Sequence, residues 1–404
     1  MANTFKFGTN GNWAVKDGSA LAYNDENNNF KPLPFDFTRA SSATTLNRQG
    51  LIETVGSGKP RIDFTDNTSG HLLLEPSRTN LFTYSEDFNQ SYWGKADISI
   101  DSNAEISPDG TLNADRFTEG TGSAQHRIFV IPQVVSGVPY TISCYVKRNS
   151  GNRGFIIDSL HTGIRVNFNL INGTIISESN GTGSIDSVGN GWYRCSVSGV
   201  STSTSGGTYF SPTVNGSQTF TGDGTSSFSL YGVQLEQGSY QTSYVKTEGS
   251  SVTRVAERNS QGNLSNILSS SGVLYTEIEL GKSTTNTSSN NLRFSLSNNG
   301  STSDWVFFGI EGGDNLRTYV RASGSTTTDN TVNGVFPSAG TYKIAFRFDS
   351  NNTKVFVNGV EKYSDTSSTP PSNLNFIQQG GGGALASDIE ETLKVIETRL
   401  YNTA

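Results

Sequence analysis

Short alternations of apolar and polar residues recur along most of this chain, which is the pattern of half-buried β-strands. Between residues 81 and 250 they predict eight strands separated by Gly or Asn turns, at 114–117, 124–130, 140–147, 154–158, 164–170, 191–200, 209–213 and 227–235. Strands this short and this closely spaced favour a two-sheet sandwich of jelly-roll type.

A second series of alternations follows a turn-rich stretch at 248–271. It predicts strands at 273–280, 291–297, 305–310, 316–321, 340–349 and 354–358. Asn358 and Gly359 lie between apolar alternations, as a type I′ hairpin requires. Residues 388–400 fit either a helix or a strand, and we favour the strand. We therefore expect a second sandwich over residues 272–404.

Residues 1–36 have a different character, with a polar run at 24–29 and two prolines that favour extended backbone. Their apolar surface comes mainly from Phe5, Phe7, Trp13 and Tyr23. That surface is enough to dock against a partner but too small to fold alone. We expect a docking arm that uses these four side chains, with a flexible terminus as the alternative. Residues 37–80 then form a short β-rich linker module.

The composition supports an all-β protein. The chain has 404 residues, of which 33% are hydrophobic, with 44 Gly and a single Met. No stretch sustains the apolar stripe of a long helix, so a large helical bundle is excluded. No apolar run approaches the ~18 residues of a membrane span, and the first six residues do not begin a secretory signal.

The charge pattern excludes two classes of partner. The formal net charge is −7, and 29 basic residues are scattered among 36 acidic ones. Nucleic acids and anionic membranes attract clustered Lys and Arg, so we expect neither as a partner.

The two cysteines, Cys144 and Cys195, lie in apolar alternating runs. We expect buried free thiols on neighbouring strands, and a cross-strand disulfide is the alternative. The three histidines, His71, His126 and His161, lie far apart without metal-site spacing, so we expect isolated surface or loop histidines. Nucleophile-elbow and Walker motifs are absent from the sequence, which excludes nucleotide chemistry.

Four ordered motifs occupy the region after residue 36: FTRASSAT at 37–44, NRQGLIE at 47–53, PRIDF at 60–64 and LLLEPSRTNL at 72–81. This block resembles a module of tailed-bacteriophage virion proteins, including tail fibres, tail spikes and head appendages. The resemblance implies a virion structural protein, made in the cytoplasm of the bacterial host. It also implies partners among capsid, portal or tail proteins, a homotrimer, and a virion-attachment role for residues 1–36.

Within this block Arg39, Arg61 and Arg78 are expected to tie loops together through bonds to carbonyls and carboxylates. The sandwich at 81–250 is similar to carbohydrate-binding-module jelly rolls through PYTISCYVK at 139–147, GWYR at 191–194 and YGVQLE at 231–236. The region 272–404 is similar to concanavalin A-like and laminin-G-like jelly rolls through GTYKIAFRF at 340–348 and the hairpin after it.

These resemblances imply a glycan ligand, because sugar rings stack on aromatic faces while polar groups bind their hydroxyls. The candidate residues are Trp192, Tyr193, Tyr209, Trp305, Tyr319 and Arg321. For each aromatic residue the alternative is a place in the sandwich core, which we favour for Trp192. Modules of both types often bind structural calcium. The candidate ligands are Glu86, Asp87, Asp223 and Glu236. Acidic turns solvated by water are the alternative.

Glu277 and Glu279, two residues apart on one strand, are the only enzyme-like feature that we weigh. Glycosidases of the concanavalin-like fold use a Glu-x-Asp-x-x-Glu strand, and this sequence lacks the third acid. We therefore expect strand-surface carboxylates and no enzyme. The favoured interpretation is a virion surface protein that attaches to a host-surface glycan by weak, multivalent binding. The alternatives are a purely structural capsid, head-decoration or fibre-anchoring protein and, less favoured, a glycan depolymerase.

Overall fold

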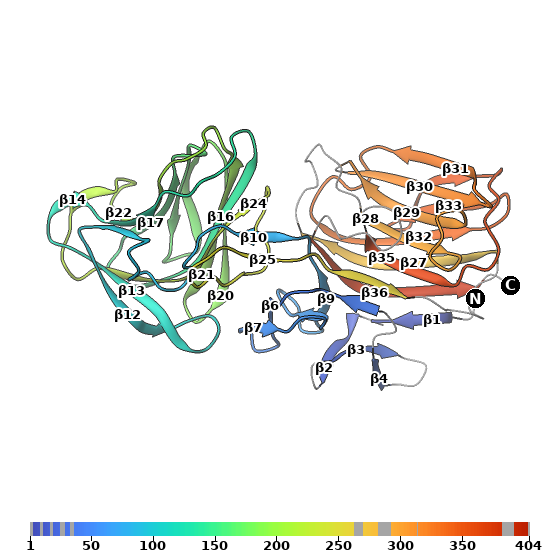
Figure 1. Ribbon diagram of the computed structural model, residues 1–404, viewed down its shortest axis with the longest axis horizontal. Helices are drawn as coiled ribbons and strands as arrows, with labels where there is room; N and C mark the ends of the chain where they lie inside the picture. The colour runs from blue at the N-terminus through green and yellow to red at the C-terminus, as the bar shows by residue number, and fades with distance from the viewer. Residues whose placement is uncertain are drawn as a thin grey trace. The chain divides into compact units, whose positions relative to one another are not determined.

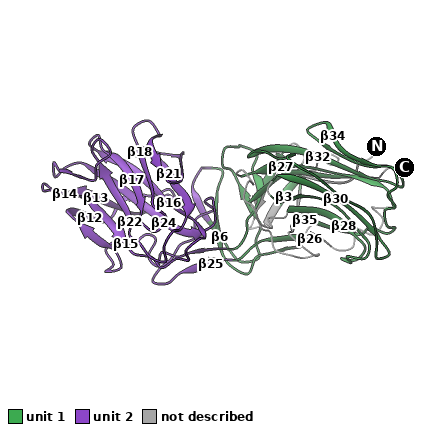
Figure 2. Cartoon of the chain, turned by 90° about the horizontal axis from the view of Figure 1, so that it is seen from above, with its two compact units in different colours: residues 1–48, 54–77, 255–404 green, residues 49–53, 78–254 purple. Residues whose placement is uncertain are grey.

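The computed structural model describes residues 3–8, 11–16, 19–24, 29–32, 36–261, 270–281, 292–312, 314–381 and 392–402. This part of the chain contains β-strands and no α-helix, which confirms the all-β fold class (Figure 1). Nor does it contain a helix long and apolar enough to span a bilayer. The chain divides into two compact units, and Figure 2 shows them in different colours.

Unit 1 comprises residues 1–48, 54–77 and 255–404, and unit 2 comprises residues 49–53 and 78–254. This division differs from the expected one. Most of the first 77 residues belong to the same unit as the C-terminal sandwich, because strands from both regions share its sheets.

Unit 1 is a sandwich of two large sheets. The eight-stranded sheet has the order β34 (Val360–Asp365), β33 (Thr353–Val357), β32 (Gly340–Phe348), β27 (Gly272–Leu280), β36 (Leu393–Asn402), β9 (His71–Leu74) and β8 (Arg61–Asp63), with β1 (Asn3–Phe7) also paired to β36. The seven-stranded sheet has the order β31 (Ser325–Val332), β30 (Asn315–Ala322), β29 (Trp305–Glu311), β28 (Leu292–Ser297), β35 (Phe376–Gly381), β26 (Arg258–Gln261) and β5 (Asp36–Thr38).

Shorter strands complete unit 1. A three-stranded sheet consists of β2 (Trp13–Lys16), β3 (Ser19–Asn24) and β4 (Asn29–Pro32). Two further strands are β6 (Ala43–Leu46) and β7 (Ile52–Val55), and β7 crosses the boundary between the units in the sequence.

The core of unit 1 lies between its two large sheets and follows the alternation in the sequence. In β27 every second residue is buried, and Leu274 and Ile278 pack in the same cluster as Phe294 and Phe308. The rings of Phe294 and Phe308 stack with centroids 5.0 Å apart. Every expected strand of this region is present, although its ends shift by a residue or two.

Two local expectations for unit 1 are confirmed. Asn358 and Gly359 have φ values of 50° and 80°, the left-handed conformations that a type I′ turn requires. The described part of 388–400 is strand β36, not a helix.

The N-terminal segment is part of the sandwich. Strand β1 pairs with β36, and Phe5 lies opposite Leu400. The pairing of β27 with β36 slips between Val395 and Glu397, so Ile396 forms a bulge. Trp13 is fully buried in the unit 1 core and donates its indole N–H to the carbonyl of Ile396 at 2.9 Å.

The docking-arm prediction is therefore wrong for Trp13, because this side chain is enclosed within the chain's own core. The alternative of a flexible terminus is wrong for the paired strand β1. Tyr23 is partly buried, and its ring meets that of Phe30 edge-on at 5.4 Å. The side chains of Phe5 and Phe7 lie outside what the structure describes.

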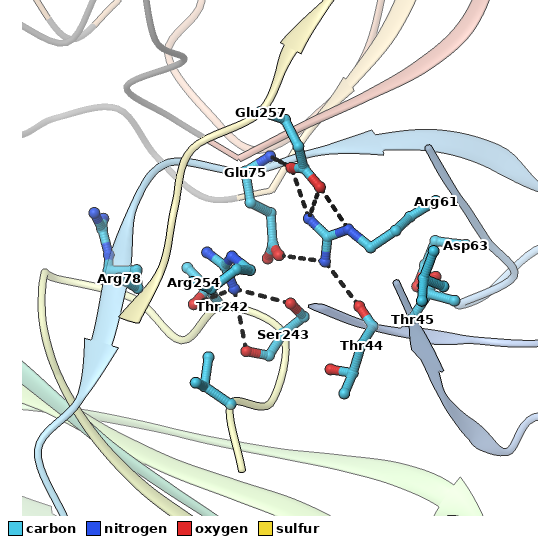
Figure 3. A network of polar contacts seen from close by, with 12 residues as sticks. Thr44, Thr45, Arg61, Asp63, Glu75, Arg78, Thr242, Ser243, Arg254 and Glu257 are labelled. Atoms are coloured by element: carbon cyan, nitrogen blue, oxygen red, sulfur yellow. Dashed lines mark hydrogen bonds and ion pairs between the residues drawn. The ribbon is translucent and has the colours of Figure 1, made fainter. Parts of the chain in front are cut away.

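A buried network of charges in unit 1 joins Arg39, Arg61 and Glu75 of the motif block to Glu257, which directly precedes strand β26 (Figure 3). Arg61 forms bonds to both carboxylate oxygens of Glu257 at 2.7 Å, to Glu75 at 2.8 Å and to the carbonyl of Thr44 at 2.7 Å. Arg39 bonds to Glu257 at 2.9 Å and to the carbonyl of Gly56 at 2.7 Å. All four charged side chains are at most 3% exposed.

The expected clamp role of Arg39 and Arg61 is thus confirmed. Arg78, in unit 2, lies 3.7 Å from Glu236 and over the ring of Tyr240, so it also ties loops together. Burial lowers the pKa of the Arg61 guanidinium, but the neighbouring carboxylates more than offset this and raise that pKa above its usual value.

Unit 2 is a sandwich of two six-stranded sheets. One has the order β11 (Gly94–Ala96), β15 (Arg127–Val130), β22 (Thr208–Thr213), β17 (Gly154–Ser159), β18 (Ile164–Asn169) and β19 (Thr174–Ser179). The other has the order β12 (Ile98–Ile106), β13 (Leu112–Glu119), β24 (Ser227–Gln237), β16 (Pro139–Ser150), β21 (Trp192–Val200) and β20 (Thr182–Gly189). Two-stranded pairs join β10 (Arg78–Asn80) to β25 (Val252–Arg254) and β14 (Ser123–Gln125) to β23 (Thr219–Thr221).

The expected free thiols are confirmed in unit 2. Cys144 of β16 lies directly opposite Cys195 of β21, and both are free and fully buried. Burial raises the pKa of both thiols, so neither is a reactive thiolate at neutral pH.

Candidate functional site

The outer face of the seven-stranded sheet in unit 1 carries an aromatic cluster separate from the core. Along β29, Val306 and Phe308 point into the core, so the alternate residues Trp305 and Phe307 point the other way. Together with Tyr319 of β30 they form their own cluster. Their ring centroids lie 4.6 to 5.6 Å apart, and Phe307 stacks on Tyr319 with an interplanar angle of 17°.

Two arginines cover these rings. The guanidinium carbon of Arg293, on β28, lies 4.9 Å from the ring centre of Phe307 and 5.7 Å from that of Trp305. The guanidinium carbon of Arg317, on β30, lies 5.7 Å from the ring centre of Phe307 and 5.5 Å from that of Tyr319. Each distance is within the reach of a cation–π contact.

Two carboxylates hold the arginines in place. Glu311 accepts from Nε of Arg293 at 2.8 Å and from Arg317 at 3.1 Å. Asp329, on β31, accepts two parallel bonds from Arg317 at 2.9 and 3.0 Å. Hydrogen bonding by Asp329, and then by Glu311, raises the pKa of Arg317 above its usual value and outweighs the opposite effect of burial. The guanidinium is therefore fixed in both charge and orientation.

The exposed part of this cluster is polar. Asp329 is 46% exposed and Arg317 is 27% exposed at the side chain, whereas Trp305 and Tyr319 are only 8% and 9% exposed. Arg321 is partly exposed opposite Trp305 and donates its Nε–H to the carbonyl of Gly324 at 3.0 Å. We call this set the aromatic–arginine face: Arg293, Trp305, Phe307, Glu311, Arg317, Tyr319, Arg321 and Asp329.

The aromatic–arginine face offers oriented N–H donors beside carboxylate acceptors, both supported by rigid rings. That combination suits a ligand rich in hydroxyl groups, since each hydroxyl donates one bond and accepts others. Stacking of a sugar on an open tryptophan face is not available here, because the two arginines and the sheet cover the rings. The sequence candidates Trp305, Tyr319 and Arg321 are brought together.

Sequence reasoning missed five members of the face: Arg293, Phe307, Glu311, Arg317 and Asp329. The alternation in β29 and β30 could have identified some of them, because residues two apart on one strand lie on the same face of the sheet. Phe307 and Arg317 follow from Trp305 and Tyr319 in this way. Arg293 and Asp329 lie on the flanking strands, so only the strand order of the sheet identifies them.

The three glycan candidates of unit 2 do not form such a site. Trp192 is 2% exposed and donates its indole N–H to the carbonyl of Ile106 at 3.0 Å. The buried position that we favour for it is confirmed, and its candidate role as a sugar-stacking residue is wrong. Tyr193 packs against the unit 2 core. Tyr209 is partly buried, and the guanidinium of Arg127 covers its ring at 4.3 Å.

The four calcium candidates already have hydrogen-bonding or charged partners within unit 2. Glu236 is fully buried and accepts from the backbone and hydroxyl of Thr242. Asp223 accepts from Thr225, Ser226 and Arg153. Glu86 bonds to Tyr244 and Lys246, and Asp87 bonds to Asn89 and Gln90. Across the described residues, no three acidic, His or Cys side chains gather as metal ligands. These four carboxylates therefore do not fit a shared cation, and calcium binding stays a prediction.

Glu277 and Glu279 lie on the other large sheet of unit 1, in β27, and alternate with its core residues. Glu279 lies 3.6 Å from both His71 and Lys394. His71 and then Lys394 hold the pKa of Glu279 below its usual range, which is opposite to the shift that a general acid needs. The pair thus forms surface ion pairs in a strand.

Of the expected surface or loop positions for the histidines, the loop position is confirmed for His126 and His161, and a surface position is wrong for all three. His71 is 9% exposed within β9, and His126 and His161 are fully buried, although these two do lie between strands.

Comparison with known proteins assigns no family. No family model and no curated protein matches the chain. Among solved structures, the galectin LEC-6 of Caenorhabditis elegans is 14% identical, covers 35% of this chain and 94% of its own, and has a TM-score of 0.24. The tandem CBM22 domains of Xyn10C from Paenibacillus barcinonensis are 12% identical, cover 80% of this chain and 98% of their own, and have a TM-score of 0.26.

The Bacillus licheniformis β-glucanase is 17% identical, over 37% of this chain and 72% of its own, also with a TM-score of 0.26. Likenesses at this level assign neither a ligand nor an activity to the chain.

Proposed function

We propose that this protein is a surface component of a tailed-bacteriophage particle, in a head or tail appendage, and that it attaches to a host-surface glycan through the aromatic–arginine face. The observation that carries the glycan part is the placement of Arg317, which is bonded to Glu311 and Asp329 over two aromatic rings. The motif block at 37–81 supports the virion part, with capsid, portal or tail proteins as the other partners.

Attachment without hydrolysis is part of this proposal. The aromatic–arginine face has two carboxylates, and both are engaged by arginines, so neither is free to act as a nucleophile or a proton donor. Weak binding at each site suffices, because many copies on one particle raise the effective concentration of sites. Assembly as a homotrimer would add to the same effect.

A glycan array tests the ligand. We expect saturable binding by the wild type and at least a tenfold loss, about 1.4 kcal/mol, for Arg317→Ala. Arg347→Ala is the matched control, because Arg347 pairs with Asp349 at 2.9 Å but lies on the other large sheet of the unit. Equal melting temperatures would show that the loss is local. Wild-type binding by Arg317→Ala, or loss in both variants, contradicts the site.

Antibody labelling of phage particles in electron microscopy tests the virion part. We expect the label on a head or tail appendage. Particles of a phage that encodes this protein but that bind no antibody would contradict the virion part of the proposal. Release of reducing sugar from a bound polysaccharide would overturn the non-enzymatic part.

A further inference from the structure

His161 of unit 2 is buried without a polar partner. It lies in the turn between β17 and β18, its side chain is fully buried, and neither ring nitrogen has a hydrogen-bond partner in the described structure. The contact made by its ring is edge-on to Tyr140, with centroids 6.0 Å apart. His126 in the same unit differs, because both of its ring nitrogens face carbonyl oxygens, at 2.8 and 3.1 Å.

The backbone of His161 holds neighbouring loops together. Its carbonyl accepts from the backbone N–H of Thr202 at 2.8 Å and from the hydroxyl of Ser201 at 3.2 Å. Gly206 packs directly against it, since a Cβ there would lie 2.5 Å from the nitrogen of His161. We call residues 131–138, 160–163 and 201–207 the loop cluster.

The same contacts extend to the third segment. Val134 donates its N–H to the carbonyl of Thr204 at 2.9 Å, and Gly137 donates to the carbonyl of Ser201 at 2.7 Å. The hydroxyl of Tyr140, whose ring meets His161, accepts from the N–H of Val135 at 3.0 Å. His161 is therefore connected to all three segments, through its own backbone and through Tyr140.

The loop cluster offers no charge that could stabilise a protonated ring. The loop cluster contains no Asp, Glu, Lys or Arg. The titratable side chain that packs against the imidazole is the Tyr140 phenol, which carries no positive or negative counter-group of its own in the loop cluster. An imidazolium at this position would have neither a counter-charge nor an acceptor.

We propose that His161 is an acid-sensitive latch, and that its protonation opens the loop cluster of unit 2. The ring takes up a proton only when it reaches water, so acid favours the open form. Opening releases segments that carry Ile131, Val135 and Leu160, which are already 57 to 61% exposed in the closed form. Acid therefore changes this end of the sandwich from a closed surface into a mobile apolar one.

The size of the response follows from proton linkage. Burial lowers the pKa of His161 from 6.5 to about 4. A depressed pKa means that the closed form has its full stability above pH 6.5 and loses it as the pH falls toward 4. With a pKa of 6.5 in the open form and about 4 in the closed form, the equilibrium constant for opening rises about 20-fold from pH 7 to pH 5. The rise reaches about 300-fold once the pH is well below 4.

Hydrogen–deuterium exchange of the full chain, corrected for intrinsic rates, tests the latch. We expect peptides from 131–138 and 201–207 to open about 20-fold more at pH 5 than at pH 7. In His161→Phe, which keeps a ring against Tyr140 but takes up no proton, we expect no rise. His71→Gln, in unit 1, is the control and keeps the rise.

An unchanged wild type, or a rise that persists in His161→Phe, overturns the proposal. If His161→Phe does not fold, NMR titration of the wild-type ring decides the matter. A His161 pKa near 4 supports the latch, and a pKa of 6 or above overturns it.

Discussion

Arg61 and Glu257 lie 196 residues apart in the sequence and form a bidentate ion pair in the interior of unit 1, with both bonds at 2.7 Å. Glu257 also accepts from Arg39, and Arg61 also donates to Glu75, so two positive and two negative groups neutralise one another in the buried interior. Arg39, Arg61 and Glu75 of the motif block are therefore joined by buried charges to Glu257 within unit 1. Removal of any one of the four leaves a buried charge uncompensated.

Removal of one member of this network is expected to destabilise unit 1 strongly. Glu257→Gln leaves Arg39 and Arg61 with one carboxylate between them, and we expect a loss of about 3–5 kcal/mol in the free energy of unfolding. Urea denaturation measures it. Lys354→Ala, which breaks the exposed pair with Glu361, is the control and should cost far less. Equal losses in the two variants would contradict the role of the network.

The N-terminal segment is expected to stabilise the sandwich. Trp13→Ala removes a fully buried indole and its bond to Ile396, so we expect a loss of about 3–5 kcal/mol in the free energy of unfolding. Phe30→Ala changes an aromatic residue that is 43% exposed in the same small sheet, and it should cost far less. A wild-type denaturation curve for Trp13→Ala would show that the segment does not contribute.

Asp63 is expected to make unit 1 sensitive to acid. Burial raises the pKa of Asp63, but Lys394 at 3.3 Å and hydrogen bonds from Thr65 and Leu46 outweigh it, so that pKa lies below 3.8. Its contribution to stability is present above pH 3.8 and is lost as the pH falls through the lower folded-state value.

Melting temperatures between pH 6 and pH 2 check this prediction. The wild type should melt at a higher temperature than Asp63→Asn at pH 6, and this difference in melting temperature should become smaller as the pH falls below about 4. Lys394→Met removes the ammonium group that lowers the pKa of Asp63, so in this background the difference in melting temperature should begin to shrink at a higher pH. A gap that stays constant over the whole range would exclude Asp63 as the source.

The two thiols of unit 2 are expected to be unreactive while the protein is folded. Cys144 and Cys195 are fully buried with raised pKa values, so a thiol reagent should modify neither in native buffer and both in denaturant. A colorimetric thiol assay with and without guanidinium measures this. Rapid modification of the native protein, or a disulfide found by mass spectrometry after gentle isolation, would contradict the packing.

The strands with the clearest apolar alternation could be predicted because their signal is local. In β27 the buried residues alternate along a single segment, so the pattern of apolar positions is sufficient. The edge strands β19 and β20 were not predicted, because their residues are mostly exposed and carry no apolar alternation. Their backbone pairing with β18 and β21 makes them strands.

The candidate site was only partly predictable for a related reason. Trp305, Tyr319 and Arg321 stand out as aromatic and basic residues within predicted strands, so they could be named from the sequence. Which face of the sheet they share, and whether their rings are open, depends on neighbouring strands. Arg293 comes from β28 and covers the ring of Phe307, and no local pattern contains that contact.

The sequence by itself determined the all-β class, the hairpin at Asn358 and Gly359, and the burial of the two thiols, because each depends on alternation or turn chemistry within a few residues. Only the tertiary structure decided that Trp13 fills the core beside β36 and that Glu257 neutralises Arg61. Such contacts join residues hundreds of positions apart. They form because a buried charge, or a buried indole N–H such as that of Trp13, is stabilised by a partner within the chain when the closed core separates it from solvent.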